Sequence, residues 1–329
     1  MSYTHLTEEE RYHIDELLRQ GVSQSIIATK LCRSKSTLSR ELRRNKGQRG
    51  WRPQQAHKKA SERLSIRGVH NTTKIDESAW EYAVDKLVHE QWSPEQINGR
   101  QQKEALPSIS HESIYQRILS DKNNGGDLYT HLRCKKKRKK RYGSKSPKKQ
   151  IIPNRIDIDE RPNIVNERTR IGDWEGDTVI GSHTGGAVLA TMVERKSRLV
   201  VVAKSQNKTT KSVIDSIITK MEPISELFET ATFDNGPEFA NHEHLATQLH
   251  GMVYFAKPYR SWERGVNENT NGLLRQYFPK KTSFDSIEER EFECAANKIN
   301  NRPRKCLGFE TPCEVFRKLA EQKGVALRI

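Results

Sequence analysis

Helical spacing of apolar residues runs through the first third of the chain. A capping box of Thr7 and Glu10 precedes the apolar stripe of a first helix, which Gly21 ends. A short helix over "SQSIIATKL" follows, and Ser34 caps a third helix over "KSTLSRELRRN". Three helices with a tight turn before the last one predict a helix-turn-helix unit over residues 1–50.

The third of these helices has the two faces that a DNA-reading helix needs. Leu38 and Leu42 bury one face, and Ala28 allows close approach where the helices cross. Cys32 takes the turn position where glycine is usual, at a modest backbone cost. A small helical bundle with a solvated basic face is the alternative. We expect the outward side chains to contact base edges and phosphates: Ser36, Thr37, Ser39, Arg40, Arg43 and Arg44.

A second helical unit is predicted over residues 51–132. Ser93 caps a helix that has Pro94 at its first position, and Ser110 caps the next helix. The connection between them is longer than in the first unit, so a structural helical pair fits the pattern as well as a DNA reader does. Beside the first unit, we favour a second helix-turn-helix whose outward residues reach DNA: His111, Ser113, Gln116 and Arg117.

From about residue 161 the pattern changes to short β-type runs alternating with helices. "GDWEGDTVIG", "AVLATMVER" and "RLVVVAKS" predict three antiparallel strands, and "TATF" and "MVYFA" predict two more, each after an amphipathic helix. Helical crossovers make the added strands parallel. The predicted fold class is therefore α+β multidomain, with helical N-terminal units and a C-terminal domain over residues 161–329 that has a mixed five-stranded sheet.

The net charge of +16 lies in the first half of the chain. Residues 1–155 hold 33 Lys and Arg against 17 Asp and Glu, whereas residues 156–329 hold 25 against 25. Such segregation is typical of a module that binds a polyanion, nucleic acid before acidic protein or a membrane surface. Seven residues in a row are basic, Lys135 to Arg141, which predicts a disordered linker over residues 133–160. We expect this linker to bind along the phosphate backbone of DNA. A merely solvated linker is the alternative.

Composition disfavours several other classes of protein. No apolar run approaches the roughly 18 residues of a membrane helix, and the N-terminus lacks a signal-peptide pattern. The five cysteines are scattered, with no Cys-x-x-Cys pair and no zinc-finger spacing. We therefore expect a soluble cytoplasmic protein with reduced thiols and no membrane partner.

Three carboxylates occupy positions where an α/β sheet presents a site. Asp177 lies on the first predicted strand, Asp234 ends the fourth strand at its carboxyl edge, and Glu268 lies early in a following helix. Converging carboxylates repel one another unless a hard cation binds them, and Mg²⁺ or Mn²⁺ prefers such oxygen ligands. Two ions about 4 Å apart serve phosphoryl transfer by activating the attacking oxygen and stabilising the leaving one.

Pattern alone leaves the choice of carboxylate open at two of these positions. Asp173 and Glu175 share a strand face with Asp177 at period two, so any of the three fits a ligand. Glu263 is an alternative to Glu268, although it precedes the helix in a predicted loop.

Neighbouring residues have structural interpretations. Glu238 fits an acid at the start of a helix, where it favours the helix dipole. His242 and His244 diverge on a helix and are predicted at the surface, and Trp174 is predicted to pack on the sheet. The segment "RPRKCLGFETPCEVF" is interpreted as structural closure of the domain, with Thr311 and Pro312 starting a last helix.

The motifs around these carboxylates resemble those of bacterial insertion-sequence transposases of the Asp-Asp-Glu type, within the retroviral-integrase superfamily. "WEGDT", "FDNGPEF" and "GVNENTN" match its strand, turn and helix segments in order, with 33 residues between Asp234 and Glu268. "GDWEGDT", "NNRPRKCLGFETPCEVF" and the two N-terminal helical units are similar to the IS-thirty family over essentially the whole chain. Unlike retroviral integrases, this sequence has no His-His-Cys-Cys zinc module.

The resemblance implies a ribonuclease-H-like catalytic domain whose catalytic and metal-binding residues are Asp177, Asp234 and Glu268, with two Mg²⁺ or Mn²⁺ ions. It also implies that Arg275, two helical turns after Glu268, touches DNA phosphate beside the site. The implied partners are double-stranded DNA, as terminal inverted repeats and target, and further copies of the chain in a homodimer or larger oligomer. The implied activity is that of a transposase, namely metal-dependent DNA strand cleavage and strand transfer. The implied location is the cytoplasm, in association with the nucleoid.

Two other functions are compatible with the same sequence. A ribonuclease-H-fold nuclease would cut DNA without joining it. A helix-turn-helix regulator would carry an inactive integrase-like domain, but three carboxylates in the order and spacing of the family argue against it.

Overall fold

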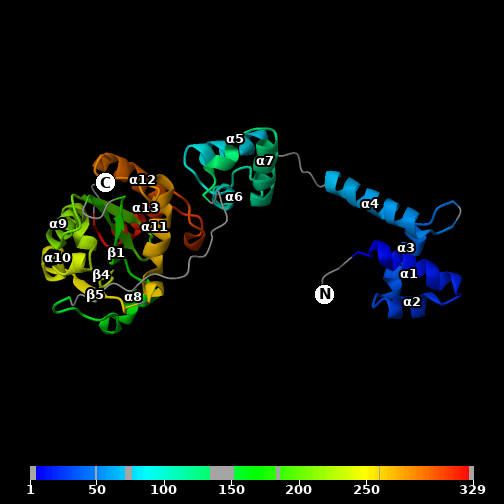
Figure 1. The fold of residues 1–329 in the computed structure, drawn as a ribbon, viewed down its shortest axis with the longest axis horizontal. Helices are drawn as coiled ribbons and strands as arrows, with labels where there is room; N and C mark the ends of the chain where they lie inside the picture. Colours follow the sequence, from blue (N-terminus) through cyan, green and yellow to red (C-terminus); the bar gives the residue numbers. More distant parts are fainter. Residues whose placement is uncertain are drawn as a thin grey trace. The chain divides into compact units, whose positions relative to one another are not determined.

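The chain folds into two compact units, Met1–Ile75 and Asp76–Ile329 (Figure 1). Helix α4 (Pro53–His70) packs against α1 (Glu8–Arg19), so the first unit extends beyond the boundary predicted after residue 50. The computed structural model describes residues 5–48, 50–70, 76–133, 152–182, 186–258 and 260–325.

The first unit contains the predicted helix-turn-helix. Helices α2 (Gln24–Lys30) and α3 (Lys35–Arg44) pack through the buried side chains of Ile27 and Leu38. Between them, Cys32 has a φ of 51°, so this turn does require the left-handed backbone conformation that glycine adopts most easily. The turn is therefore formed by cysteine in the conformation expected for glycine.

Three helices with a core of their own begin the second unit. Ile97 and Ile114 are fully buried in this core. Ser93 caps α6 as predicted and forms a capping box with Gln96, whose backbone N–H donates to the serine hydroxyl at 3.3 Å. The helices are α5 (Glu77–Val88), α6 (Pro94–Lys103) and α7 (His111–Asn123).

Helix α6 contacts the segment that the sequence analysis interpreted as structural closure. The two Nη atoms of Arg100 donate to the two carboxylate oxygens of Glu314, at 2.7 and 2.6 Å. This bidentate hydrogen bonding to Arg100 lowers the pKa of Glu314 to about 2. The ring of Phe309 packs over Gly99, where a Cβ would come within 2.3 Å of it. The closing segment therefore joins the helical bundle to the sheet domain.

The C-terminal domain is built on the predicted mixed five-stranded sheet. Its strand order is β3-β2-β1-β4-β5, in which β1 pairs antiparallel with β2 and parallel with β4. This topology confirms the predicted fold class and the ribonuclease-H-like arrangement. The strands are β1 (Asp173–Ile180), β2 (Val188–Glu194), β3 (Val200–Ser205), β4 (Thr230–Phe233) and β5 (Met252–Phe255).

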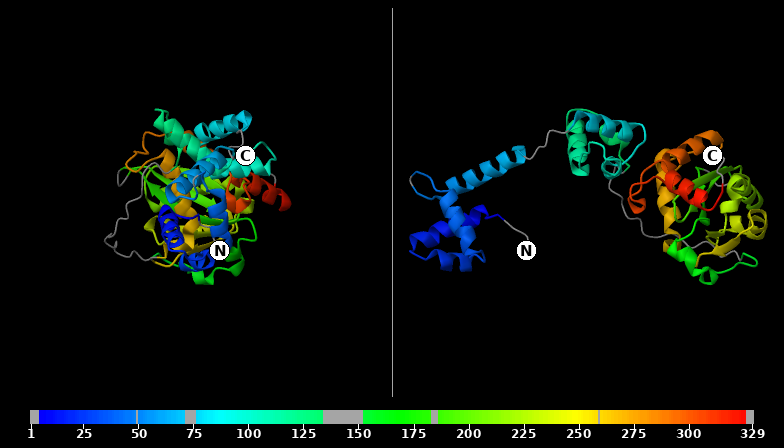
Figure 2. Two further views of the ribbon diagram at one scale, coloured as in Figure 1. Left: turned by 90° about the vertical axis from the view of Figure 1, so that its right-hand side faces the viewer. Right: turned by 180° about the vertical axis from the view of Figure 1, so that it is seen from behind.

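Helices cover both faces of the sheet, which gives the domain two hydrophobic cores (Figures 1 and 2). Helices α9, α10 and α13 pack on one face, and α11 and α12 pack on the other. Trp174 lies in the first core as predicted, and its indole N–H donates to the carbonyl of Leu227 at 3.0 Å. The helices are α8 (Asn163–Glu167), α9 (Thr210–Met221), α10 (His242–Leu249), α11 (Gly265–Tyr277), α12 (Glu289–Asn300) and α13 (Pro312–Gln322).

The sheet domain begins before residue 161. Ile152 is buried in its first core, and the carbonyl of Ile156 accepts a hydrogen bond of 2.9 Å from the Phe255 N–H. The C-terminal part of the predicted linker thus belongs to the fold, whereas the basic run Lys135 to Arg141 lies outside the described residues. Across the described ranges, every helix is too short or too polar to span a membrane.

Gly176 on β1 provides a test of packing at the strand that carries Asp177. A Cβ at this position would lie 2.0 Å from the ring of Phe233, which is fully buried. We expect Gly176→Ala to lower the free energy of unfolding by about 1–3 kcal/mol, because the core cannot accept the added methyl group. Urea denaturation of the full chain measures the change.

The matched control is Gly265→Ala at the start of α11, where a Cβ would meet no atom within 4 Å. We expect this variant to keep or slightly raise the stability, because alanine has the higher helix propensity. Equal destabilisation by both substitutions would contradict the packing explanation.

Candidate active site

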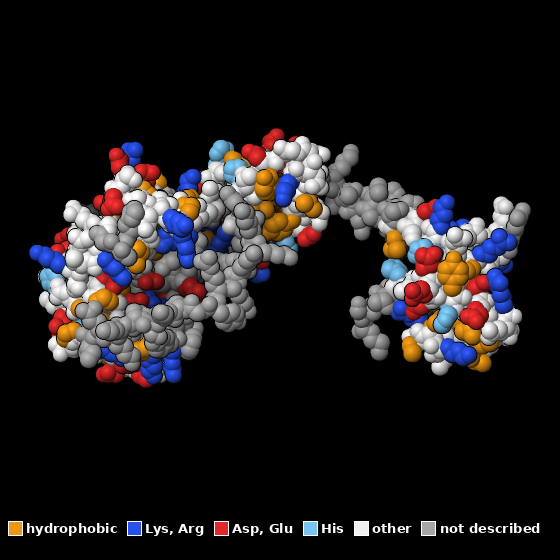
Figure 3. All heavy atoms as spheres, in the orientation of Figure 1, with side chains coloured by type: hydrophobic (Ala, Val, Ile, Leu, Met, Phe, Trp, Pro, Cys, Tyr) orange, Lys and Arg blue, Asp and Glu red, His pale blue; other side chains and the backbone are white. Residues whose placement is uncertain are grey.

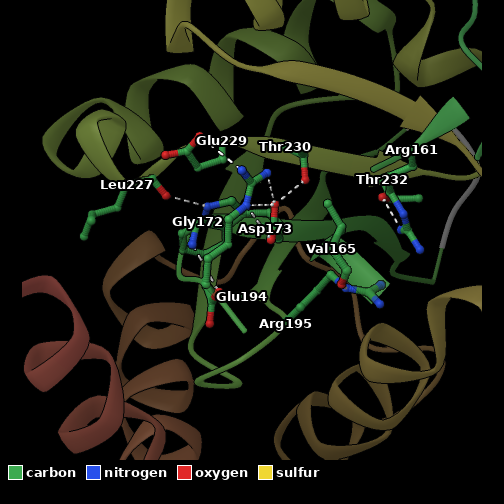
Figure 4. Close-up of polar contacts among 12 residues, drawn as sticks. Arg161, Val165, Gly172, Asp173, Glu194, Arg195, Leu227, Glu229, Thr230 and Thr232 are labelled. Atoms are coloured by element: carbon green, nitrogen blue, oxygen red, sulfur yellow. Dashed lines mark hydrogen bonds and ion pairs between the residues drawn. The ribbon is translucent and has the colours of Figure 1, made fainter. Parts of the chain in front are cut away.

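The structure distinguishes the three carboxylates that share one face of β1. Asp173 is completely buried at the start of the strand (Figure 4). Its carboxylate accepts hydrogen bonds from Arg170 Nη2 at 2.9 Å and from the Thr230 hydroxyl at 2.8 Å. With its oxygens bound by protein donors and no exposure to solvent, Asp173 has a structural role.

Glu175 is likewise buried and satisfied. Arg195 Nη1 donates to its Oε1 at 2.5 Å, and the backbone N–H of Asn267 donates to its Oε2 at 3.2 Å. The Asn267 contact attaches α11 to β1. Of the three alternatives, only Asp177 is exposed to solvent, with 25% of its side chain accessible.

Asp177 is oriented by the helix that crosses β1. The Nδ2 of Asn271 on α11 donates to Asp177 Oδ2 at 2.8 Å, and the Thr178 N–H donates to Oδ1 at 2.9 Å. The guanidinium of Arg264 approaches from the residue before α11, with Nη1 3.8 Å from Asp177 Oδ1. The carboxylate therefore accepts from one side-chain amide and one backbone N–H, and it faces one cation.

Asp234 directly follows β4, and the strand register brings it to Asp177. β1 and β4 run parallel with Glu175 opposite Thr232, so two residues further on Asp177 and Asp234 are neighbours. Nη2 of Arg264 lies 3.4 Å from Asp234 Oδ2, which places both carboxylates against one guanidinium. The side chain of Asp234 is 40% exposed.

Asp234 also forms the turn in which it lies. Its Oδ1 accepts a hydrogen bond of 3.0 Å from the N–H of Gly236. A Cβ on Gly236 would come within 2.6 Å of Glu238 Oε2 and 2.9 Å of Asp234 Oδ1. A larger residue at this position would therefore displace one or both of these carboxylates.

Glu238 has a larger role than that of an acid at a helix start. It lies in a short 3₁₀ turn and is only 4% exposed. Its Oε1 accepts from the Thr178 hydroxyl at 2.8 Å and lies 3.0 Å from Lys208 Nζ. Its Oε2 has no hydrogen-bond partner among the described residues. Glu238 thus adds a third negative charge behind Asp177 and Asp234.

Burial and neighbouring charges act in opposite directions on Asp177. Burial raises the pKa of Asp177, the Arg264 guanidinium lowers it, and the Asp234 carboxylate raises it again. The net shift is upward from the ordinary value. Burial is the largest cause of this shift, and the two carboxylates face a single guanidinium.

Glu268 is not brought into contact with this pair. Its side chain is exposed on α11, and within the described ranges no group of three acidic, histidine or cysteine side chains is arranged to hold a metal ion. Glu268 precedes Asn271 by one helical turn, so the two lie on neighbouring parts of the helix surface. Glu263, the alternative, accepts a hydrogen bond of 2.9 Å from the Lys257 N–H and braces the preceding loop.

Arg275 is engaged with the protein in this structure. Its Nη2 donates to the carbonyl of Ile180 at 2.7 Å, while its Nη1 is buried with no partner among the described residues. Burial lowers the pKa of Arg275. The structure thus places Arg275 at the end of β1.

The predicted DNA-reading residues of α3 lie on its outer surface. All six are exposed except Thr37, which is half-buried and contacts the cap residue Ser34 through its hydroxyl at 2.8 Å. Arg40, Arg43 and Arg44 form no ion pair within the described residues. This helix therefore presents three uncompensated cations to solvent.

The outer surface of α7 differs. The Arg117 guanidinium lies 4.2 Å from the centre of the Trp80 ring and its Nη2 is 3.7 Å from Glu77, so this arginine is already engaged. His111 and Gln116 are exposed and Ser113 is half-buried. Hydrophobic side chains gather over this helix (Figure 3), and their exposed members include Tyr115 and Leu119.

Sequence reasoning missed several residues around the site. Arg264 and Asn271 both lie within or beside the "GVNENTN" segment, but only the fold shows that they face Asp177. The prediction for His242 was wrong: this side chain is 4% exposed and packs edge-on against Phe255. His244 is exposed as predicted.

The carboxylate oxygens of Asp177 and Asp234 are suitable ligands for a hard divalent cation. Mg²⁺ is commonly held by one or two carboxylates, with water and substrate phosphates as further ligands. Asp177 and Asp234 supply carboxylate oxygens that are partly exposed and under-neutralised. These two residues therefore fit the metal that the resemblance implies.

Comparison with known proteins identifies the family to which the chain belongs. Residues 2–45 match a family model described as a helix-turn-helix domain. The chain is 41% identical over 324 residues to the transposase for insertion sequence element IS4351 of Bacteroides fragilis, covering 98% of each. It is 36% identical over 336 residues to the transposase InsI for insertion sequence element IS30A of Escherichia coli K12, covering 98% of this chain and 85% of that one.

One solved structure that it resembles is the catalytic core domain of BIV integrase. The TM-score is 0.36 at 23% identity, over 46% of this chain and 97% of that chain. With similarity over nearly its whole length, the chain falls in the class of insertion-sequence transposases. It belongs to the IS30 family of these transposases, which confirms the resemblance to the IS-thirty family inferred from the motifs.

The raised pKa of Asp177 predicts a pH-dependent effect of its removal. The unfolded chain loses this proton near the ordinary value of 3.8, below the pKa of the folded chain. The wild type therefore loses stability as the pH rises through that interval, and Asp177→Asn does not. We expect the variant to be the more stable form at pH 7, with the difference shrinking towards pH ~4.

Urea denaturation of both proteins from pH 4 to pH 8, in the presence of a chelator, measures this difference. A variant that is less stable at pH 7, or a difference that does not depend on pH, would contradict the inferred environment of Asp177.

Proposed function

We propose that this protein is a transposase that binds the terminal inverted repeats of an insertion sequence and catalyses DNA cleavage and strand transfer. The supporting observation is the meeting of Asp177 and Asp234 at one guanidinium, at the carboxyl ends of two parallel strands. Open α/β sheets place their sites at this edge.

The proposed catalytic residues are Asp177, Asp234 and Glu268. Asp177 and Asp234 would hold divalent metal, Mg²⁺ or Mn²⁺ and two ions in all, and Glu268 would join them as a ligand from the adjoining surface of α11. When bound, the ions supply activation of the attacking oxygen and stabilisation of the leaving oxygen in an in-line displacement.

The chain's own residues prepare this site. Asn271 fixes the orientation of Asp177, and the turn at Gly236 fixes that of Asp234. Arg264 offsets the repulsion between the two carboxylates until other cations replace it. Because water and then the freed 3′-hydroxyl are the nucleophiles, the proposal needs no covalent protein–DNA intermediate.

DNA recognition is assigned first to α3. Its exposed arginines suit phosphate contacts, and its first turn places Ser36 and Thr37 where base edges are read. The engaged Arg117 and the exposed apolar residues of α7 make the second bundle the weaker candidate. Joining two element ends in one event implies a homodimer or a larger oligomer on DNA.

The central experiment measures cleavage and joining of a labelled duplex carrying one end of the element, with Mg²⁺ or Mn²⁺. We expect Asp177→Asn, Asp234→Asn and Glu268→Gln each to reduce both steps by at least about 100-fold, the order found for loss of one charge-stabilising group. The matched control is Glu321→Gln, an exposed carboxylate on α13, which should retain activity.

Each alternative outcome has a defined meaning. Full activity in the three variants would exclude the assigned residues. Cleavage without a joined product in the wild type would favour a nuclease. Specific binding without any chemistry would favour a regulator.

The assignment of α3 predicts the salt dependence of binding. Each arginine that neutralises one phosphate adds about one to the slope of log K against log salt. We expect Arg43→Ala and Arg44→Ala each to lower the slope by about one, measured by fluorescence anisotropy on the element end. Arg19→Ala on α1 is the control, and an equal loss there would contradict the assignment to α3.

A further inference from the structure

A cavity of about 320 Å³ opens beside the start of α11. Three arginines from separate parts of the chain line it: Arg168 after α8, Arg198 in the turn between β2 and β3, and Arg304 after α12. Gly265 and Val266, in the first turn of α11, line the same cavity. The fold thus gathers three cations at the N-terminal end of a 13-residue helix.

These arginines lack anionic partners. None of the three forms an ion pair with any residue that the structure describes. Arg304 Nη2 donates to the Ile299 carbonyl at 3.2 Å, and its inaccessible Nε has no partner within the described ranges. By contrast, three arginines beside β1 each face a carboxylate: Arg170, Arg195 and Arg264.

The cluster is electrostatically unfavourable as it stands. Burial and the neighbouring Arg302 lower the pKa of Arg304 to about 10. Burial and the neighbouring Arg168 also lower the pKa of Arg198. Partly buried like charges of this kind destabilise a fold unless an anion compensates them. The arrangement therefore favours binding of an anion from outside the chain.

A phosphate group suits this cavity. Guanidinium groups donate in pairs to phosphate oxygens, and the first turn of a helix adds backbone N–H groups and a positive dipole. There is room beside that turn, since a Cβ on Gly265 would meet nothing within 4 Å. A fourth arginine, Arg133, extends the basic surface, with its Nη2 3.5 Å from the Asn269 side chain at the cavity.

The cavity and the carboxylates lie on different sides of the same helix. Val266, Asn269 and Thr270 line the cavity, whereas Asn271 contacts Asp177. A helix is on the order of 10 Å across. At about 3.4 Å per nucleotide, a few nucleotides of one DNA strand cover that distance.

We propose that Arg168, Arg198 and Arg304 form a phosphate pocket that binds the DNA backbone beside the scissile position, across α11 from Asp177 and Asp234. This inference rests on the proposed function, because it takes DNA as the substrate of the carboxylate site. The proposal gives Arg304, in the "NNRPRK" segment, a role in binding DNA, whereas the other residues of this segment close the fold.

The first test measures binding of the full chain to a duplex carrying the element end as a function of salt. We expect Arg168→Gln, Arg198→Gln and Arg304→Gln each to lower the salt slope by about one. Arg290→Gln, an exposed cation on α12, should leave the slope unchanged. Unchanged slopes in all three pocket variants would overturn the proposal.

The second test follows thermal unfolding with inorganic phosphate or chloride at equal ionic strength. Phosphate should raise the midpoint of the wild type and of Arg290→Gln, but not that of Arg304→Gln. Without phosphate, the pocket variants should be as stable as the wild type or more so, because a like charge is removed. Arg168→Gln, at the exposed rim, tests the pocket without disturbing buried packing.

The two tests separate a DNA-backbone site from a free-anion site. Stabilisation by phosphate with unchanged salt slopes would show a site for free anions and overturn the DNA assignment. Neither measurement requires cleavage. If the pocket variants lower the salt slope but the wild type neither cuts nor joins DNA, the phosphate pocket is supported and the proposed function is overturned.

Discussion

The organising constraint of the catalytic domain is the alternation of side chains along one buried strand. The first three alternate positions of β1 carry carboxylates, Asp173, Glu175 and Asp177, and share one face of the strand, on which Glu175 and Asp177 contact α11. Each carboxylate faces an arginine from another element, in the pairs Asp173–Arg170, Glu175–Arg195 and Asp177–Arg264. Only the Glu175–Arg195 pair is buried on both sides, and Glu175 also accepts from the Asn267 N–H and so attaches α11 to the strand. Among the three carboxylates, only Asp177 is reached by solvent.

The last pair differs because its arginine is shared. Arg264 faces both Asp177 and Asp234, and Glu238 adds a further charge behind them. A site with excess negative charge costs stability, and such costs are typical where a protein binds cations or reacts. The other side of α11 has the opposite imbalance, with three arginines and no described carboxylate partner. One helix therefore separates a surface suited to cations from a surface suited to phosphate.

The elements were predictable from sequence because their signals are local. Short apolar and β-branched runs predicted the five strands, and the capping residues Thr7, Ser93 and Thr311 predicted three helix starts. Burial depends on contacts between distant segments, so the buried positions of Glu238 and His242 were not predictable. The choice among the β1 carboxylates also needed the fold, because burial separates them and because Arg195 and Arg264 come from segments distant in the sequence. Glu268 remains a prediction from motif spacing, since the structure leaves it exposed.

Cation binding tests most directly whether Asp177 and Asp234 act as one site. Electron paramagnetic resonance of Mn²⁺ titrated with the full chain, without DNA, reports the free ion. The wild type should bind Mn²⁺, and Asp177→Asn and Asp234→Asn should each lose most of this affinity. The double variant should lose little more than either single variant, because one shared site has already been removed. Mn²⁺ binding of wild-type strength in either single variant would contradict the account.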